Sequence, residues 1–342
     1  APDQAQPYEP VGGGYNKRLL TGLLRETYGF RGVILTDWLI TDDCKDACIS
    51  GAPAGQAPTI VPGRYGMSWG VQDIPVPDRY AKAIEAGVDQ FGGVDRPDIL
   101  VKLVQQGRVR EQRLNESAAR ILEQTFALGL FEHPFVDPQA AAGVVGNPAF
   151  LQQSLQAQHR SMVLLENRDA LLPLKAPAPG TVRRVFLYGV EPEVAARYAL
   201  TPVPSLAEAD LAILRMHAPY QTLHPGYFFG SRQHEGDLDF KDDDEQFRVF
   251  QQAVGKVPTI VAISLDRPAV LSQLTSSAGA ILANFGASDE AILDVITGRA
   301  KPEGKLPFEL PSSMDAVRAQ MPDRPHDSAG PLFPFGFGLS YP

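Results

Sequence analysis

Residues 28–38 read Tyr-Gly-Phe-Arg-Gly-Val-Ile-Leu-Thr-Asp-Trp. The short apolar run Val33-Ile34-Leu35, bounded by Gly32 and Asp37, predicts a buried strand of the parallel kind, apolar on both faces. Asp37 would then stand just beyond the end of this strand. Such positions face the active site in a (β/α) barrel, whereas in most folds an Asp after a strand caps a helix or makes a turn. The residues alone leave both roles open for Asp37.

The sequence around this segment alternates between helical and extended patterns. Apolar spacing and Gly or Pro boundaries predict helices over 16–28, 77–86, 97–106 and 111–128, and strands over 33–35 and 87–92. Residues 1–130 are therefore interpreted as two or three βα units followed by extra helices. Residues 131–147, rich in Pro, Ala and Gly, are interpreted as an interdomain linker.

The remainder, residues 148–342, shows a clearer βα rhythm. The patterns predict helices over 148–166, 245–254, 268–276 and 288–297, and strands over 185–188, 211–216, 259–264 and 280–284. This alternation is typical of a mostly parallel sheet with helices on both faces. We therefore expect residues 148–342 to form an α/β sandwich domain.

Composition narrows the class of protein. The 342 residues are 44% apolar and 21% charged, with a formal net charge of −9. That balance argues against nucleic acid or an anionic membrane surface as a partner, and no run reaches the ~18 apolar residues of a membrane span. Residues 1–10 have neither the basic head nor the apolar stretch of a signal peptide.

The two cysteines, Cys44 and Cys48, lie four residues apart in a loop-like segment. They could form a small disulfide or be two unrelated thiols. No His lies near them at ligand spacing, so the sequence predicts no metal site there.

The segment from Gly29 to Trp38 resembles the nucleophile segment of family 3 glycoside hydrolases, in which the Asp before Trp attacks the anomeric carbon. Four later segments resemble the same family in the same order. They are the helix pair around 113–129, Leu164-Leu165-Glu166-Asn167 running into Leu171-Leu172-Pro173-Leu174, Gly304-Lys305-Leu306-Pro307-Phe308, and Leu332-Phe333-Pro334-Phe335-Gly336-Phe337-Gly338-Leu339-Ser340-Tyr341. These five matches span almost the whole chain.

This resemblance implies an α/β protein with two parts. Residues 1–130 would be the C-terminal part of a (β/α)8 barrel that carries the nucleophile Asp37, and residues 148–342 would carry the acid/base loop. A complete barrel takes about 250 residues, and the family's nucleophile comes from a late strand. The earlier strands are therefore expected on another polypeptide, an N-terminal half chain of the same enzyme.

The second catalytic group is harder to assign. A retaining glycosidase needs a nucleophile and an acid/base about 5–5.5 Å apart, and in the family the acid/base is usually a Glu on a variable loop of the second domain. Residues 226–240 follow a predicted strand and are rich in Gly, aromatic and acidic residues. We expect Glu235 to be the acid/base, with Asp237 and Glu245 as alternatives. The competing interpretation is a solvated loop whose acids pair with nearby basic residues.

Candidates for substrate binding are Trp38, Trp69, Phe228, Arg232 and His234. Aromatic faces stack well on the apolar face of a pyranose ring. Phe228 and Phe229 would also lower the local dielectric and so raise the pKa of Glu235. Arg232 and His234 would contact the sugar or tune Glu235, or would instead serve the structure of the loop.

Together these expectations define a retaining β-glycosidase, an exo-acting β-glucosidase that hydrolyses terminal β-D-glucosyl residues by double displacement. A β-xylosidase or β-N-acetylglucosaminidase of the same family is an alternative, and so is a non-catalytic carbohydrate-binding remnant. The chemistry needs no metal and no organic cofactor. The expected substrate is an oligosaccharide or β-glucoside, and the resemblance favours a periplasmic or secreted location.

Overall fold

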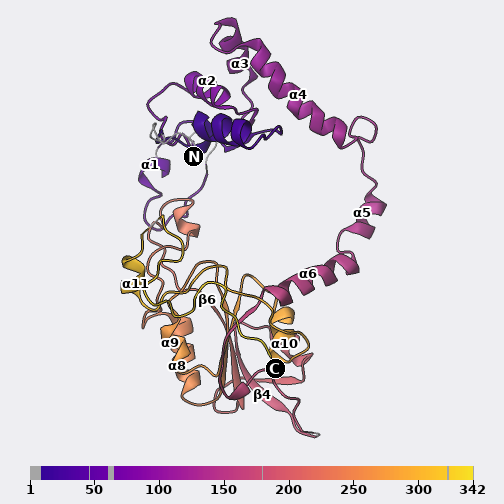
Figure 1. Ribbon diagram of the computed structural model, residues 1–342, viewed down its shortest axis with the longest axis vertical. Helices are drawn as coiled ribbons and strands as arrows, with labels where there is room; N and C mark the ends of the chain where they lie inside the picture. Colours follow the sequence, from indigo (N-terminus) through magenta and orange to yellow (C-terminus); the bar gives the residue numbers. More distant parts are fainter. Residues whose placement is uncertain (1–8, 46, 61–64, 179, 322, 342) are drawn as a thin grey trace. The chain divides into compact units, whose positions relative to one another are not determined.

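The computed structural model describes residues 9–45, 47–60, 65–178, 180–321 and 323–341. They divide into two compact units (Figure 1). The first unit comprises Ala1–Ala141 and Thr222–Gln233, and the second comprises Ala142–Gln221 and His234–Pro342. The segment Thr222–Gln233 therefore packs with the first unit, although the chain before and after it belongs to the second.

The first unit is mainly helical, with one small parallel sheet. Its helices are η1 (Gly13–Tyr15), η2 (Arg18–Thr27), α1 (Ala47–Ser50), α2 (Val76–Ala86), α3 (Pro97–Gln105), α4 (Glu111–Ala127) and, in the inserted segment, η4 (Gly230–Arg232). Strands β1 (Leu35–Trp38) and β2 (Gln90–Gly92) pair in parallel, with Leu35 opposite Gln90 and Trp38 opposite Gly92. The chain continues into α5 (Pro138–Val144), which lies within the stretch predicted as a linker.

The prediction of a buried strand over 33–35 was wrong in place and in burial. The strand begins at Leu35, whose side chain is 49% exposed, and Thr36 is its only buried residue. The physical reason is that only two strands pair among the described residues of this unit, so most of the surface of β1 is not covered.

Helix α2 holds the first unit together because it contributes to both of its apolar cores. Ala83 packs with Tyr15 and Val88 on one side. Tyr80 and Ile84 pack on the other side, in a core that includes residues of α3. The left-handed Gly87 ends α2 and turns the chain into β2.

The second unit is an α/β sandwich around a six-stranded sheet. Its elements are α6 (Pro148–Ser161), β3 (Val163–Asn167), η3 (Arg168–Ala170), β4 (Arg183–Tyr188), α7 (Pro192–Ala196), β5 (Leu200–Val203), β6 (Leu211–His217), α8 (Glu245–Val254), β7 (Thr259–Ser264), α9 (Ser272–Thr275), β8 (Ala280–Asn284), α10 (Asp289–Ile296) and α11 (Met314–Arg318). The strand order is β3-β8-β7-β6-β4-β5. All neighbours are parallel except β3, which runs antiparallel to β8.

Alternate side chains of the central strands enter two separate cores. In β7, Val261 and Ile263 pack with aromatic residues of α8. Ile260 and Ala262 point to the opposite face and pack with α10. Figure 1 shows α8 and α9 on one side of the sheet and α10 on the other. The predicted mostly parallel sheet with helices on both faces is confirmed.

Several local predictions for this unit were wrong. The helix over 148–166 ends at Ser161, and its expected last turn is the strand β3 instead. The helix over 268–276 is reduced to α9, and β5 and α7 were not predicted.

The described part of the chain contains no helix that is long and apolar enough to cross a bilayer.

The two closing segments pair with each other and with β3. Leu306 and Phe337 are joined by a backbone hydrogen bond of 2.9 Å, and the Leu339 N–H donates to the Leu164 carbonyl at 2.8 Å. A β-carbon at Gly338 would come within 2.5 Å of the Gly304 carbonyl. A β-carbon at Gly304 would likewise come within 2.5 Å of the Ser161 carbonyl, so both positions require glycine.

Candidate active site

Asp37 lies in β1, one residue before the carboxyl end of the strand, and its side chain is exposed. Its Oδ1 accepts a hydrogen bond of 2.7 Å from the backbone N–H of Trp38. Because β1 and β2 are parallel, the carboxyl ends of both strands lie at the same edge of the sheet. Asp37 therefore stands at the kind of strand end where a (β/α) barrel carries its catalytic groups.

The backbone around Asp37 is fixed by the end of β2 and by a later loop. The buried Thr36 hydroxyl donates to the Asp37 carbonyl at 2.7 Å and accepts from the Gly92 N–H at 3.0 Å. Leu39 has a φ of 60°, a conformation that costs a non-glycine residue on the order of 1 kcal/mol or more. Its N–H donates to Gly92 and its carbonyl accepts from Met67. The chain after Asp37 is thus held in one strained conformation.

Trp38 presents an exposed aromatic face beside Asp37. The side chain is 57% exposed, and it packs over the glycines that end β2. A β-carbon at Gly92 would lie 3.0 Å from Trp38 Cε3. One side of the indole therefore packs against the backbone of β2, and the rest of the ring remains accessible to stack on a sugar.

Trp69 is also exposed, at 52% of its surface. Its carbonyl accepts from the Gly12 N–H at 2.8 Å. The next residue, Gly70, has a φ of 77° and lies so close to Pro10 that a β-carbon would clash with its carbonyl. The backbone at Trp69 is fixed by the segment that precedes η1.

Cys44 and Cys48 form a disulfide. Cys44 also makes an antiparallel bridge with Tyr65, and the neighbouring Gly66 N–H donates to the Asp43 carbonyl at 2.9 Å. The described residues between these ends, 44–45, 47–60 and 65–66, therefore belong to a loop whose two ends are joined by backbone contacts. We call it the disulfide loop.

The disulfide loop holds the aromatic part of the segment Thr222–Gln233, and both belong to the first unit. The Ala52 N–H donates to the Gly226 carbonyl at 2.7 Å. The Tyr65 ring meets Phe228 and Phe229 edge-on, with centroids 6.1 and 6.3 Å away. Phe229 is 40% exposed. The structure thus places these aromatic residues in the same unit as Asp37.

Arg232 folds back onto its own segment. Its guanidinium lies 3.9 Å from the centre of the Phe228 ring and donates to the Phe228 carbonyl at 2.6 Å. A second contact of 3.1 Å reaches the Ser231 hydroxyl. These contacts give Arg232 a role in shaping the segment, whereas its role in sugar binding stays a prediction.

Glu235 follows this segment and lies in the second unit, half-buried. Its backbone forms a reciprocal pair with Gln221, with N–H to carbonyl distances of 2.9 and 3.0 Å. Gly236 then takes a φ of 71°, and a β-carbon there would come within 2.0 Å of Gln221 Oε1. Glu235 is therefore paired with Gln221 just before a bend that requires glycine at position 236, and we call residues 234–237 the Glu235 turn.

His234 packs against two side chains of the second unit. Its Nδ1 pairs with the Asp266 carboxylate, and its ring stacks on Tyr220 with centroids 3.6 Å apart. The ring is accordingly oriented from both sides. Tyr220 and Asp266 were not identified in the sequence, because nothing in their local pattern marks long-range partners.

The two alternative acids fit the acid/base role less well. Hydrogen bonding to Lys241 at 2.8 Å holds the pKa of Asp237 below its usual range. A general acid must instead stay protonated near neutral pH. Glu245 lies in the first turn of α8 and is exposed. Glu235 therefore stays the proposed proton donor.

Asp89 is the buried electrostatic centre of the first unit. Its side chain is completely inaccessible and forms ion pairs with Arg25, Arg113 and Arg120. Burial raises the pKa of Asp89, but hydrogen bonds from the Ile34 N–H, Ser117 and Arg120 outweigh it, and the pKa is lowered overall. These bonds connect η2, α4 and the entry of β1 to the start of β2.

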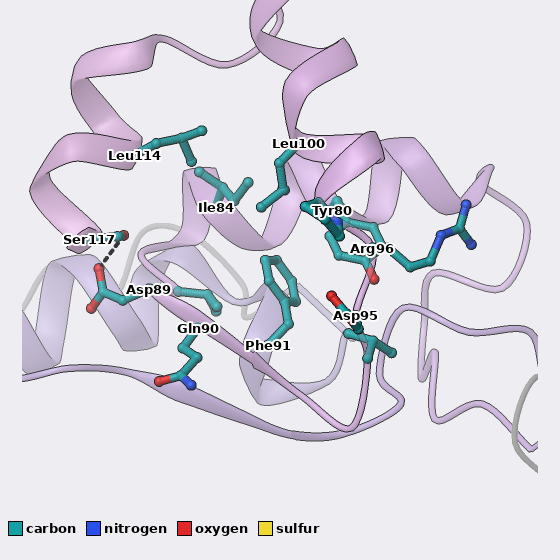
Figure 2. Close-up of a pocket in the computed structure, with 13 residues that line it drawn as sticks. Tyr80, Ile84, Asp89, Gln90, Phe91, Asp95, Arg96, Leu100, Leu114 and Ser117 are labelled. Atoms are coloured by element: carbon teal, nitrogen blue, oxygen red, sulfur yellow. Dashed lines mark hydrogen bonds between the residues drawn. The ribbon is translucent and has the colours of Figure 1, made fainter. Parts of the chain in front are cut away.

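Asp89 and Ser117 also line a pocket next to β2, in which Ser117 donates to Asp89 at 2.7 Å (Figure 2). The other labelled residues include Phe91, Tyr80 and Leu100. Neither Asp37 nor Glu235 lines this pocket, so it is separate from the candidate catalytic residues. Within the described ranges, no group of three or more His, Cys, Asp or Glu residues is arranged to hold a metal ion.

The chain's second unit contains a match to a known protein family. Residues 200–341 match the Glycosyl hydrolase family 3 C-terminal domain. The matched stretch contains four of the six sheet strands of the second unit, β5 to β8, together with the Glu235 turn and both closing segments.

Two curated relatives match nearly the whole chain. A protein named periplasmic beta-glucosidase/beta-xylosidase, from Dickeya chrysanthemi, is 47% identical over 336 residues, which is 98% of this chain and 50% of the relative. A probable beta-glucosidase C from Aspergillus flavus is 44% identical over 337 residues, again 98% of this chain and 50% of the relative. The chain thus spans about half the length of the curated relatives it matches.

Solved structures show the same fold. A β-glucosidase from Erythrobacter marinus superposes with a TM-score of 0.74 at 20% identity, over 97% of this chain and 51% of that one. A β-glucosidase from Listeria innocua in complex with isofagomine gives a TM-score of 0.69 over the same shares.

Proposed function

We propose that this chain belongs to glycosyl hydrolase family 3, whose C-terminal domain its residues 200–341 match, and that it is the catalytic half of an exo-acting β-glucosidase. Relatives named as β-glucosidases match 98% of the chain at 44–47% identity. The observation that carries the proposal is the exposed carboxylate of Asp37 at the carboxyl end of β1. Its position agrees with the nucleophile of the resembled family.

In the first step, an Asp37 carboxylate oxygen attacks the anomeric carbon of the bound β-glucoside. The bond between this carbon and the leaving oxygen breaks as Glu235 donates a proton to that oxygen. The products are a covalent glucosyl–Asp37 ester, a free alcohol or shortened saccharide, and an ionised Glu235.

In the second step, water replaces the sugar on Asp37. The Glu235 carboxylate removes a proton from a water molecule as the water oxygen attacks the anomeric carbon. The ester bond to Asp37 breaks, β-glucose leaves with its configuration retained, and both carboxyl groups return to their starting states. Asp237 suits the acid role less well, because its hydrogen bond with Lys241 lowers its pKa and so favours the ionised carboxylate.

Aromatic residues would supply much of the sugar binding. Trp38 is supported by the glycines of β2 and keeps 57% of its surface exposed. Phe228 and Phe229 are held by Tyr65 of the disulfide loop. Each offers an apolar face for a pyranose ring or for the aglycone. Trp69, Arg232 and His234 complete the proposed set.

We further propose that a polypeptide equivalent to the other half of the relatives completes the sheet of the first unit. The relatives are about twice as long as this chain, and β1 and β2 form a two-stranded sheet in the described residues. Isolated two-stranded sheets are marginal in water, and Leu35 is 49% exposed on β1. Additional strands would cover this surface and bring further sugar-binding groups.

A periplasmic or secreted location is part of the proposal. The Dickeya relative is named periplasmic, and the Cys44–Cys48 disulfide suits an oxidising compartment.

The test is the activity of the protein as purified from its source, on a panel of nitrophenyl β-glycosides, together with intact mass. The proposal predicts hydrolysis of the glucoside and a second polypeptide, or a chain longer than 37.1 kDa. Asp37→Asn should reduce kcat by about 10³-fold or more. Asp98→Asn, an exposed acid of α3 in the same unit, is the matched control and should leave kcat unchanged.

The name of the Dickeya relative includes β-xylosidase activity, so the panel decides between the two sugars. If the protein prefers the xyloside, the proposed substrate becomes a β-xyloside, and the proposed mechanism is unchanged. A folded protein that hydrolyses no glycoside in the panel would contradict catalysis and favour a carbohydrate-binding role.

A further inference from the structure

Arg267 holds the backbone of the turn that carries Glu235. It lies three residues after the end of β7, and its guanidinium donates to the carbonyls of three consecutive residues. The distances are 3.0 Å to His234, 2.6 Å to Glu235 and 2.8 Å to Gly236. A planar guanidinium suits this task because its donors have a fixed geometry.

The opposite side of the turn is held by Gln221. Its backbone pairs reciprocally with Glu235, and its Oε1 accepts from the Asp237 N–H at 3.2 Å. The left-handed Gly236 fits between these contacts, because a β-carbon there would clash with Gln221. The backbone of Glu235 is therefore held between Gln221 and Arg267.

The residue before Arg267 adds a contact on the same turn. Asp266 pairs with the His234 ring, which also stacks on Tyr220. Two consecutive residues at the carboxyl end of β7 thus hold both residues that precede Gly236. In open parallel α/β sheets, the residues that contact the ligand commonly lie at the carboxyl ends of the strands.

We propose that Arg267 is a positioning residue for proton transfer by Glu235. A general acid must lie within hydrogen-bond reach of the leaving oxygen, and a displacement of about 1 Å is sufficient to impair such a step. Charge-assisted bonds from Arg267 fix the backbone from which the Glu235 side chain extends. This inference rests on the proposed function, in which Glu235 is the acid/base.

The proposal predicts a dependence on the leaving group. A dinitrophenolate leaves without protonation, whereas a phenolate needs the acid. Arg267→Met should therefore lower kcat/KM about 100-fold on phenyl β-glucoside and only a few-fold on 2,4-dinitrophenyl β-glucoside. Azide should also raise kcat of this variant on the dinitrophenyl substrate and yield β-glucosyl azide, because azide needs no general base.

The matched control is Arg168→Met. Arg168 also donates to consecutive carbonyls of the second unit, those of Thr275 and Ser276, but these do not belong to the Glu235 turn. Its removal should affect both substrates equally and only slightly. Arg267→Lys keeps the positive charge but lacks the planar set of guanidinium donors, so it should show the same leaving-group dependence in weaker form. This variant replaces Arg267→Met in the test if the Met variant does not fold.

Equal losses on both substrates in the Arg267 variants, or no loss, would overturn the proposal. Glu235→Gln separates this failure from failure of the proposed function. If Glu235→Gln itself shows no leaving-group dependence, the assignment of the acid/base is wrong. If it shows the dependence and both Arg267 variants do not, only the positioning role of Arg267 is refuted.

Discussion

The indole of Trp38 lies so close to Gly93 that a β-carbon at position 93 would come within 2.3 Å of Trp38 Cδ1. Gly93 also has a φ of 68°. Trp38, which follows the proposed nucleophile Asp37, therefore packs against Gly93, where there is no room for a side chain. Any substitution at Gly93 must displace the indole, the backbone of β2, or both.

Gly93→Ala should therefore impair substrate binding. We expect KM for the glucoside to rise several-fold, because Trp38 can no longer occupy its present position. Gly129→Ala is the control, since Gly129 has a similar φ of 66° but open space around its α-carbon. Steady-state kinetics and thermal unfolding of both variants check this. Equal KM values in the two variants would argue against a role for the indole in binding.

Neutralising Asp89 should strongly destabilise the first unit. Asp89→Asn leaves the three arginines Arg25, Arg113 and Arg120 without their shared carboxylate, and breaking a buried ion pair costs about 3–5 kcal/mol. Urea unfolding measures this loss. The exposed Asp98→Asn serves as the control and should change little. A free energy of unfolding unchanged in Asp89→Asn would refute the structural role.

The Asp89 cluster also predicts a pH dependence of stability. The pKa of Asp89 is lower in the folded protein than its unfolded value of about 3.9. Its contribution is therefore present above that value and is lost as the pH falls through it towards the folded pKa. Unfolding measured between about pH 2 and pH 5 should lose stability more steeply with acid in the wild type than in Asp89→Asn. Parallel curves would contradict the assignment.

Breaking the Cys44–Cys48 disulfide should weaken substrate binding as well as lower the free energy of unfolding. The bond closes a very short loop, for which chain entropy predicts a contribution of about 2 kcal/mol. Cys44 also forms a backbone bridge with Tyr65, whose ring contacts Phe228, so the disulfide orders one side of the support of the aromatic segment. A Cys44→Ser/Cys48→Ser variant should show a raised KM that reductant does not alter, whereas reductant should raise the KM of the wild type. An unchanged KM in the variant would show that the aromatic segment does not depend on this bond.

The core of the second unit was the most predictable part of the fold. Strands β7 and β8 and helix α8 have the predicted bounds, because continuous apolar runs between turn residues mark buried parallel strands. β3 was missed because Val163-Leu164-Leu165 continues the apolar spacing of α6. A short apolar run does not distinguish strand from helix, and the pairing of β3 with β8 decides it.

The residues of the candidate site remain predictions that rest on the family resemblance. The local pattern left Asp37 open between a catalytic and a turn role, and the resemblance selected it; the same resemblance pointed to a Glu on a loop of the second unit, where Glu235 lies among Gly and aromatic residues. Arg267 was not identified, since hydrogen bonds to distant carbonyls leave no trace in the local sequence. Its place just after the predicted strand over 259–264 was the one available signal. Tyr65 was missed because its partners are distant in sequence.

The central claim is that Asp37 forms the covalent bond to the sugar. The direct measurement is to inactivate the purified protein with a 2-deoxy-2-fluoro-β-glucosyl fluoride, which forms the ester but releases it slowly, and to map the labelled peptide by mass spectrometry. The account predicts one label, on the peptide containing Asp37, and none in Asp37→Asn. A label on another carboxylate, or time-dependent inactivation that persists in Asp37→Asn, would contradict it.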